Sequence, residues 1–156
     1  MGDKHEQREL LLMRAGAHDF AVYADEAEGV AAWQEPVPLP HAPPAVLGVV
    51  CVRGRMRTVL DPAALPGGPP ESAGATEAAA PLLVVALRGD EQLALAVTRA
   101  ERADPPDAPP APPDPPAPFL RATFTRAGRA VHLLDPARLF DAALQGADRR
   151  RPRQKT

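Results

Sequence analysis

Few side chains in this sequence could act as a nucleophile. The one serine, Ser72, lies in a segment rich in proline, glycine and alanine, where no regular element can hold its hydroxyl group against a base. The one cysteine, Cys51, lies in an apolar run from Val49 to Val52, so we expect it to be buried as a small core residue. The sequence therefore predicts no nucleophilic catalysis.

The histidines and glycines do not suggest a metal or phosphate site either. The pair Gly67-Gly68 precedes prolines, and not a helix whose amides could bind a phosphate. The histidines are scattered, without the spacing of zinc ligands, at His5, His18, His41 and His132. We therefore predict that the protein is not an enzyme and needs no metal ion and no cofactor.

Arginine supplies the remaining polar chemistry, around one interior turn. Arg53, Arg55 and Arg57 surround Gly54. Such a cluster is either a solvated edge that discourages strand pairing or a contact for an acidic partner. We interpret Arg55 and Arg57 as solvated, and we interpret Arg53 as a contact for the reason given below.

The distribution of charge argues against nucleic-acid binding by the body of the protein. The formal net charge is −2, yet five of the 18 basic residues lie between Arg149 and Lys155, after all the acidic residues. The preceding part is therefore acidic, whereas phosphate contacts need a basic face. We interpret residues 147–156 as a flexible basic tail, with polyanion binding by this tail as the alternative.

No segment has the features of an export signal or a membrane span. The apolar run from Leu10 to Met13 is too short for either, and acidic residues surround it. A single cysteine also excludes an internal disulfide. We therefore expect a cytoplasmic protein without direct membrane insertion.

An internal repeat organises the elements that position these residues. A shift of 74 residues aligns residues 54–65 with residues 128–139, and seven of the twelve pairs are identical. A shift of 73 residues aligns an earlier segment, with Ala21 on Ala94. In each half, the pattern predicts two short apolar strands joined by a glycine-containing turn. After a connector, it predicts a second pair of strands that ends in Asp-Pro-Ala-x-Leu. This pattern predicts an all-β protein.

Proline marks the connectors between these strands. Nine of the 21 prolines lie in residues 105–118, which excludes a helix or a central strand there. Alone, this segment is typical of a polyproline spacer or of a ligand for proline-binding modules. Because the repeat aligns it with residues 36–44, we instead predict a loop inside the second half that buries little and is dispensable for folding.

The remaining boundaries follow from composition and helix signals. Asp135 and Pro136 are typical of a helix start, and Gly146 after Gln145 predicts its end. Glycine, proline and serine predict a connector between the halves. The predicted units are a flexible N-terminus (1–9), a first half (10–65), a connector (66–81), a second half with the proline-rich loop and the helix (82–146), and the tail.

The stretch from Pro36 to Gly54 resembles the signature of CheW-like domains, in which a proline-bearing loop leads to Gly-Val-x-x-x-Arg-Gly. Here that motif begins at Gly48 and ends at Arg53 and Gly54. A strand like Phe20 to Tyr23 and an Asp-containing Leu-x-x-Leu segment near the C-terminus extend the resemblance over about residues 10–144.

The resemblance implies two small five-stranded β-barrel subdomains packed side by side, with a short C-terminal helix. It implies a non-catalytic adaptor that couples chemoreceptors to a histidine kinase in a cytoplasmic chemosensory signalling array. The implied partners are the signalling domain of a chemoreceptor and the regulatory domain of the kinase. The implied receptor- and kinase-binding residues are Val30, Gly48, Arg53 and Gly54.

The sequence departs from the family pattern where contacts are expected. The family commonly shows Val-x-Glu-Ile before the proline loop, but this chain has Val30-Ala31-Ala32-Trp33, so the acidic residue is absent at Ala32. Thr58 and Ala100 also stand where larger apolar or acidic residues are usual. The alternative function is therefore a divergent CheW-like protein that binds receptors but not the kinase.

Overall fold

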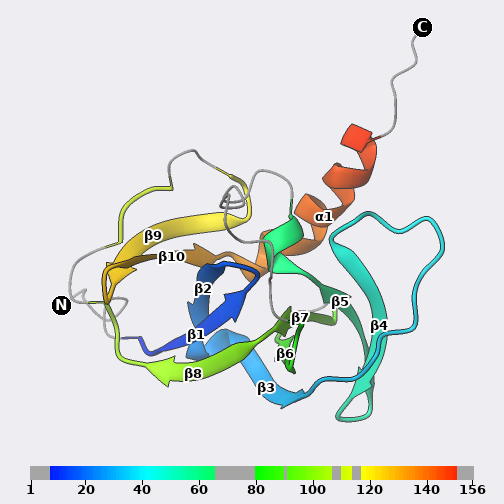
Figure 1. The fold of residues 1–156 in the computed structure, drawn as a ribbon, viewed down its shortest axis with the longest axis horizontal. Coiled ribbons are helices and arrows are strands. Elements are labelled where there is room, and N and C mark those ends of the chain that lie inside the picture. Colours follow the sequence, from blue (N-terminus) through cyan, green and yellow to red (C-terminus); the bar gives the residue numbers. More distant parts are fainter. Residues whose placement is uncertain (1–7, 66–79, 90, 107–109, 114–116, 151–156) are drawn as a thin grey trace, which may run out of the picture.

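The computed structural model describes residues 8–65, 80–89, 91–106, 110–113 and 117–150, with side chains up to residue 144. Ten strands in these residues form two five-stranded sheets (Figure 1). The strands are β1 (Leu10–Ala15), β2 (His18–Tyr23), β3 (Ala27–Ala32), β4 (Val46–Val52), β5 (Arg55–Leu60), β6 (Leu83–Leu87), β7 (Leu93–Val97), β8 (Arg99–Ala103), β9 (Leu120–Arg126) and β10 (Arg129–Leu134). The helical elements are η2 (Ala24–Glu26), η3 (Pro62–Ala64) and α1 (Pro136–Arg150).

Each sheet combines strands from both halves of the repeat. Sheet A has the order β8-β1-β2-β10-β9, and sheet B has the order β3-β6-β7-β5-β4. The hairpin β1–β2 therefore joins three strands of the second half, and β6–β7 joins three strands of the first. The prediction of two five-stranded units side by side with a C-terminal helix is confirmed, but residues 10–65 and 82–146 do not each form one of them.

The pairing of the strands follows the repeat in both sheets. One rung across sheet A joins Glu101, Leu12, Ala21, Leu133 and Ala122. The matching rung across sheet B joins Gly29, Ala86, Ala94, Val59 and Gly48. The counterparts are 74 residues apart in β1 and β6 (Leu12 and Ala86) and 73 apart in β2 and β7 (Ala21 and Ala94), so the correspondence holds strand by strand and not at one constant spacing. The predicted repeat is confirmed by this correspondence.

In the described residues, neither sheet closes into a hydrogen-bonded barrel, which corrects the prediction of two barrels. The edge strands are β8 and β9 in sheet A and β3 and β4 in sheet B. Instead of a further strand, one isolated β-bridge joins a loop residue to an edge strand in each sheet. Val37 bridges to Val49 of β4 in sheet B, and Ala111 bridges to Thr123 of β9 in sheet A. Each bridge has two backbone hydrogen bonds, of 2.9 Å in sheet B and 2.8 Å in sheet A. The sheets are thus open ladders flanked by loop segments.

The proline-rich segment 105–118 contributes to the fold at two points, so the prediction that it buries little is wrong there. Ala111 forms the bridge to Thr123. Ala117 is buried in the main core, and its carbonyl oxygen accepts a hydrogen bond from the Leu120 amide. Both residues are alanines, which keep the backbone N–H that proline lacks and fit in small spaces. Residues 107–109 and 114–116 lie outside the described part of the chain.

The main core lies between the two sheets and under α1. It contains residues of β1, β2, β6, β7 and α1, including the fully buried Phe20, Leu95 and Leu139. A smaller apolar cluster lies on the other face of each sheet, with Leu133 in sheet A and Val59 in sheet B. Because strands alternate their faces, each sheet buries both, which explains their nearly continuous apolar sequences.

Helix α1 begins as predicted and ends later. The Asp135 carboxylate accepts a hydrogen bond of 3.2 Å from the Ala137 amide, as an N-cap does. Gly146 lies inside the helix, which continues to Arg150, so the predicted end is wrong and part of the predicted tail is helical. One glycine costs a helix only about 1 kcal/mol relative to alanine and does not by itself stop it. The equivalent Asp61 caps η3, which ends after one turn as predicted.

The predicted flexible N-terminus (1–9), connector (66–81) and tail lie largely outside the described residues. Within the described part of the chain, no helix is both long and apolar enough to cross a membrane.

Candidate functional site

Arg53 and Gly54 form the turn between β4 and β5. Their φ angles are +54° and +78°, as in a two-residue hairpin turn of type I′. The counterparts Ala127 and Gly128 have φ angles of +53° and +78° in the turn between β9 and β10. Glycine adopts such angles without strain, which explains why this position needs it.

The Arg53 side chain reaches across to the edge strand β3 and lies over Gly29. A Cβ atom on Gly29 would stand 2.8 Å from the guanidinium carbon, so the glycine makes room for this arginine. Arg53 is exposed, and no hydrogen bond or ion pair joins its side chain to another described residue. No sequence pattern pointed to Gly29, because only the tertiary structure brings β3 close to the turn between β4 and β5.

Val30 follows Gly29 on β3 and is 42% exposed. Neighbouring residues of a strand point to opposite faces, so Val30 and the Arg53 guanidinium flank β3 from its two sides. Val30 pairs with Val85 of the main core, which places it at the margin of the space between the sheets. The structure thus brings the Arg53 guanidinium from the turn between β4 and β5 to the edge strand β3, where Val30 lies on the other side, while Gly54 stays in the exposed turn.

Gly48 is buried in β4, unlike the other three predicted site residues. Its φ is +143°, and a Cβ atom there would lie 2.4 Å from the carbonyl oxygen of Val37. The glycine therefore allows the loop to approach β4 and form the bridge between Val37 and Val49. The structure gives Gly48 a role in the sheet and not on the surface.

Arg57 is buried, with 2% of its side chain exposed, so its interpretation as a solvated residue is wrong. Its guanidinium pairs with Glu28 on β3 and donates to the Leu87 and Leu93 carbonyl oxygens, at 2.9 and 3.4 Å. The alternation of side chains along β5 could have indicated this burial. Arg57 lies two residues before the buried Val59, so both side chains point to the same face of the strand.

Cys51 is exposed, which corrects the prediction that it is buried. The neighbours Val50 and Val52 point inward, so alternation turns Cys51 outward. It pairs with Met56, which is 64% exposed. Val37, which bridges to Val49 of β4, is exposed beside them. We call Val37, Cys51 and Met56, on the outer face of the hairpin β4–β5, the apolar strip.

Arg121 on β9 ties the N-terminal half to the helix start. Its guanidinium lies 3.0 Å from the Glu26 carboxylate and 3.5 Å from that of Asp135. Burial lowers the pKa of Arg121, but the two carboxylates outweigh it and raise the pKa above its ordinary value. Arg121 therefore stays protonated: it links the two carboxylates through its positive charge and cannot act as a general acid.

His18 and His132 form an aromatic group with Phe20 on neighbouring strands of sheet A. The two imidazole centroids lie 6.2 Å apart, and that of His132 lies 5.7 Å from the Phe20 ring. The His18 Nε2 and His132 Nδ1 atoms are buried without a hydrogen-bond partner among the described residues. Burial, and then the charge of His18, lowers the pKa of His132, with Asp19 acting in the opposite direction.

This lowered pKa predicts that the protein loses stability below neutral pH. Between the ordinary histidine pKa of about 6.5 and the lower pKa in the folded state, the unfolded chain binds more protons. The stabilising contribution of His132 to the free energy of unfolding is therefore complete above the ordinary histidine pKa, and it decreases as the pH falls below that pKa. We expect the difference in unfolding free energy between pH 7.5 and pH 5, measured in urea, to shrink in His132→Leu.

The control variant is His41→Gln, because His41 is exposed in the proline loop. It should keep the pH dependence of the unmodified chain. An unchanged pH dependence in His132→Leu would contradict the assignment.

No group of His, Cys, Asp and Glu side chains in the described residues has the arrangement of a metal site. What gathers around Arg53 is instead a cation, an apolar side chain and a strand edge, which are features of a surface that binds another protein.

Comparison with known proteins points to one family. The family model of the CheW-like domain matches residues 9–144. The chemotaxis protein CheW of Rhizobium meliloti (strain 1021) is 37% identical over 54 residues, which are 35% of this chain and 35% of that protein. The match thus spans well under half of the relative's length.

A solved structure resembles the fold over most of its length. The crystal structure of the scaffolding protein TtCheW from Thermoanaerobacter tengcongensis aligns with a TM-score of 0.66. The alignment covers 86% of this chain and 93% of that chain at 13% sequence identity. This similarity supports the architecture of two five-stranded sheets and one C-terminal helix.

Proposed function

Because the chain belongs to the CheW-like domain family, we propose that it is a non-catalytic adaptor that couples a chemoreceptor signalling domain to a histidine kinase in a chemosensory array. One observation carries this proposal: the exposed Arg53, from the turn that it forms with Gly54, reaches the edge strand β3 and lies over Gly29, the neighbour of the exposed Val30. The cytoplasm is the proposed location, since such an array lies there.

The chemistry of this edge suits an amphipathic helix with acidic residues. Arg53 has no carboxylate partner among the described residues, so its five N–H donors are available to a partner's carboxylate. Val30 offers apolar surface on the other side of the same strand. A helix with apolar and acidic side chains on adjoining faces can use both.

We predict that Arg53→Glu weakens binding of a chemoreceptor signalling domain by about tenfold to a hundredfold, because the substitution reverses the charge that faces an acidic partner. The fold should persist, since Arg53 is exposed. Isothermal titration of the purified chain with the receptor domain measures the change.

The matched control is Arg55→Glu, which reverses an exposed charge on the same hairpin. It should change the affinity little. An equal loss in both variants would indicate general electrostatics, and an unchanged affinity in folded Arg53→Glu would remove Arg53 from the site.

The alternative, an adaptor that binds receptors but not the kinase, has its own support. Ala32 is exposed, and no acidic side chain stands there. Thr58 and Ala100 are small and half-buried. Truncated interface side chains typically cost about 1 to 4 kcal/mol each, so several such differences can abolish binding.

The apolar strip favours retained kinase binding, because methionine is enriched in interfaces. Met56 is exposed, whereas Trp33 packs against the cluster inside sheet B. Titration against the regulatory domain of the kinase decides between the two functions. Micromolar or tighter binding supports the coupling adaptor, and no binding with intact receptor affinity supports the divergent one.

A further inference from the structure

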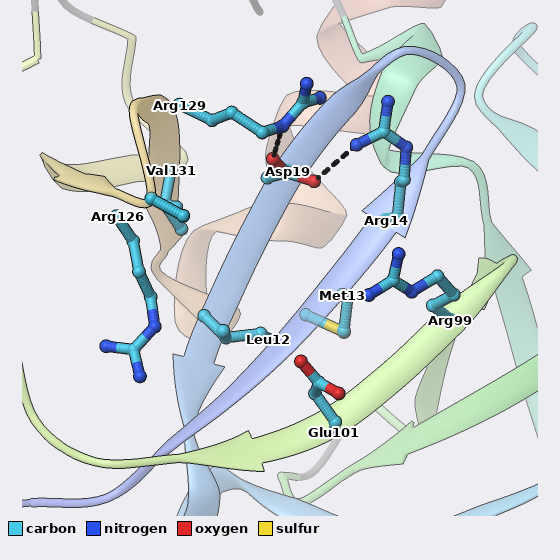
Figure 2. Close-up of a pocket in the computed structure, with 10 residues that line it drawn as sticks. Leu12, Met13, Arg14, Asp19, Arg99, Glu101, Arg126, Arg129 and Val131 are labelled. Carbon is cyan, nitrogen blue, oxygen red and sulfur yellow. Dashed lines mark hydrogen bonds and ion pairs between the residues drawn. The ribbon is translucent and has the colours of Figure 1, made fainter.

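The open end of sheet A contains a pocket of about 200 Å³ (Figure 2). It lies between the edge strand β8 and the turn from β9 to β10, over β1 and β2. Leu12, Met13 and Val131 supply apolar surface. Neither the family resemblance nor the comparisons assign a role to this pocket.

The repeat explains why the pocket exists. At the equivalent end of sheet B, Arg53 lies over Gly29 and Arg57 is buried, so arginine side chains fill the space. The counterparts 74 residues later are Ala127 and Val131, which are too short to do so. Arginine side chains of sheet B thus occupy the space that remains open in sheet A.

The charges around the pocket are predominantly positive. Four arginines line it, against the two carboxylates Asp19 and Glu101. Asp19 is already engaged through both oxygens, by Arg14 Nη1 at 3.0 Å and by Arg129 Nε at 2.6 Å. Figure 2 shows Asp19 held between these two guanidinium groups.

The other two arginines lack a carboxylate partner in the described part of the chain. No hydrogen bond or ion pair joins Arg99 or Glu101 to another described side chain, and Arg126 makes one contact of 3.5 Å to the Asp104 carbonyl oxygen. Arg99 and Glu101 project from β8 towards the pocket (Figure 2). A bound anion would therefore find guanidinium donors that no carboxylate of the described chain occupies.

We propose that this pocket binds a small organic anion, one carboxylate on a short apolar chain. The carboxylate pairs with Arg99, and the apolar chain covers Leu12 and Val131. Glu101 disfavours a second negative group and so selects a monoanion. The ligand is a free small molecule, and the proposal does not depend on the adaptor function.

The first test uses butyrate as the probe. The isotope-labelled full chain is titrated at low ionic strength, where screening is weak, and the amide resonances are followed by NMR. We expect butyrate to shift amides of β1, β8 and the turn from β9 to β10. Butylammonium and 1-butanol, which share the apolar chain, should bind at least about tenfold more weakly because the charge is reversed or absent.

The second test is the variant Ala127→Arg, which places an arginine at the position equivalent to Arg53. Arg53 has the same φ as Ala127 within a degree, so arginine fits this turn position. The new side chain should fill the pocket and abolish butyrate binding. Arg99→Gln provides a second variant should the first fail to fold, and it should weaken binding about tenfold by removing one charged donor.

The control is Arg138→Gln, which removes an exposed arginine of α1 outside the pocket. It should leave butyrate binding unchanged. The proposal is overturned if butyrate shifts none of the named amides, if butylammonium binds equally well, if only a glutamate-containing peptide binds, or if Arg99→Gln binds butyrate as the unmodified chain does.

Discussion

Gly48→Ala is expected to lower the free energy of unfolding by about 4 kcal/mol, because alanine is strained in this backbone conformation and the bridge to the loop is lost. The φ of +143° is one that residues with a Cβ rarely adopt. The added atom would also lie 2.4 Å from the Val37 carbonyl oxygen, which pushes the loop away from β4. Both hydrogen bonds between Val37 and Val49 then break. Urea unfolding at neutral pH measures the loss.

Gly89→Ala is the matched control. Gly89 has a φ of +137°, close to that of Gly48, but no atom of the described residues lies within 4 Å of the position of its Cβ atom. This variant reports backbone strain alone, which we expect to cost about 2 kcal/mol. Equal losses in the two variants would contradict the closing role of Gly48 and would reopen its assignment as a surface contact.

Arg57→Leu is expected to lower the free energy of unfolding by about 3 kcal/mol, because it leaves a carboxylate and two carbonyl oxygens without their donor. The Glu28 side chain is 32% exposed, so water partly solvates it and the loss stays at the lower end of values for buried pairs. The Leu87 carbonyl oxygen loses a hydrogen bond of 2.9 Å. Thermal and urea unfolding measure the change.

Two further variants separate charge from packing at this position. Arg55→Leu removes an exposed arginine from the same strand and should be nearly neutral. The double variant Glu28→Gln with Arg57→Leu should recover part of the loss, since no unpaired carboxylate is left. If Arg57→Leu is as mild as Arg55→Leu, the ion pair with Glu28 does not stabilise the fold.

Local features of this protein follow from the sequence alone. The repeat predicted which segments are equivalent, and the residues at its turns predicted where the chain reverses, as at Gly54. Asp135 followed by proline predicted the start of α1. Each of these signals acts within a few residues, through positive φ, side-chain caps or the alternation of apolar positions. The CheW-like signature, also contiguous, indicated the family.

Only the tertiary structure decided which hairpin joins which sheet. Both halves have the same apolar pattern, so β1–β2 and β6–β7 satisfy either sheet locally, and the exchange depends on contacts distant in sequence. The exchange sets the environment of particular residues: it brings Leu87 and Leu93 to the guanidinium of Arg57, which no residue near Arg57 could reveal. Likewise, only the packing of β8 beside the turn from β9 to β10 shows that the short side chain of Ala127 leaves a pocket in sheet A. Burial and cavities are properties of the whole packing, because the groups that meet there are far apart along the chain.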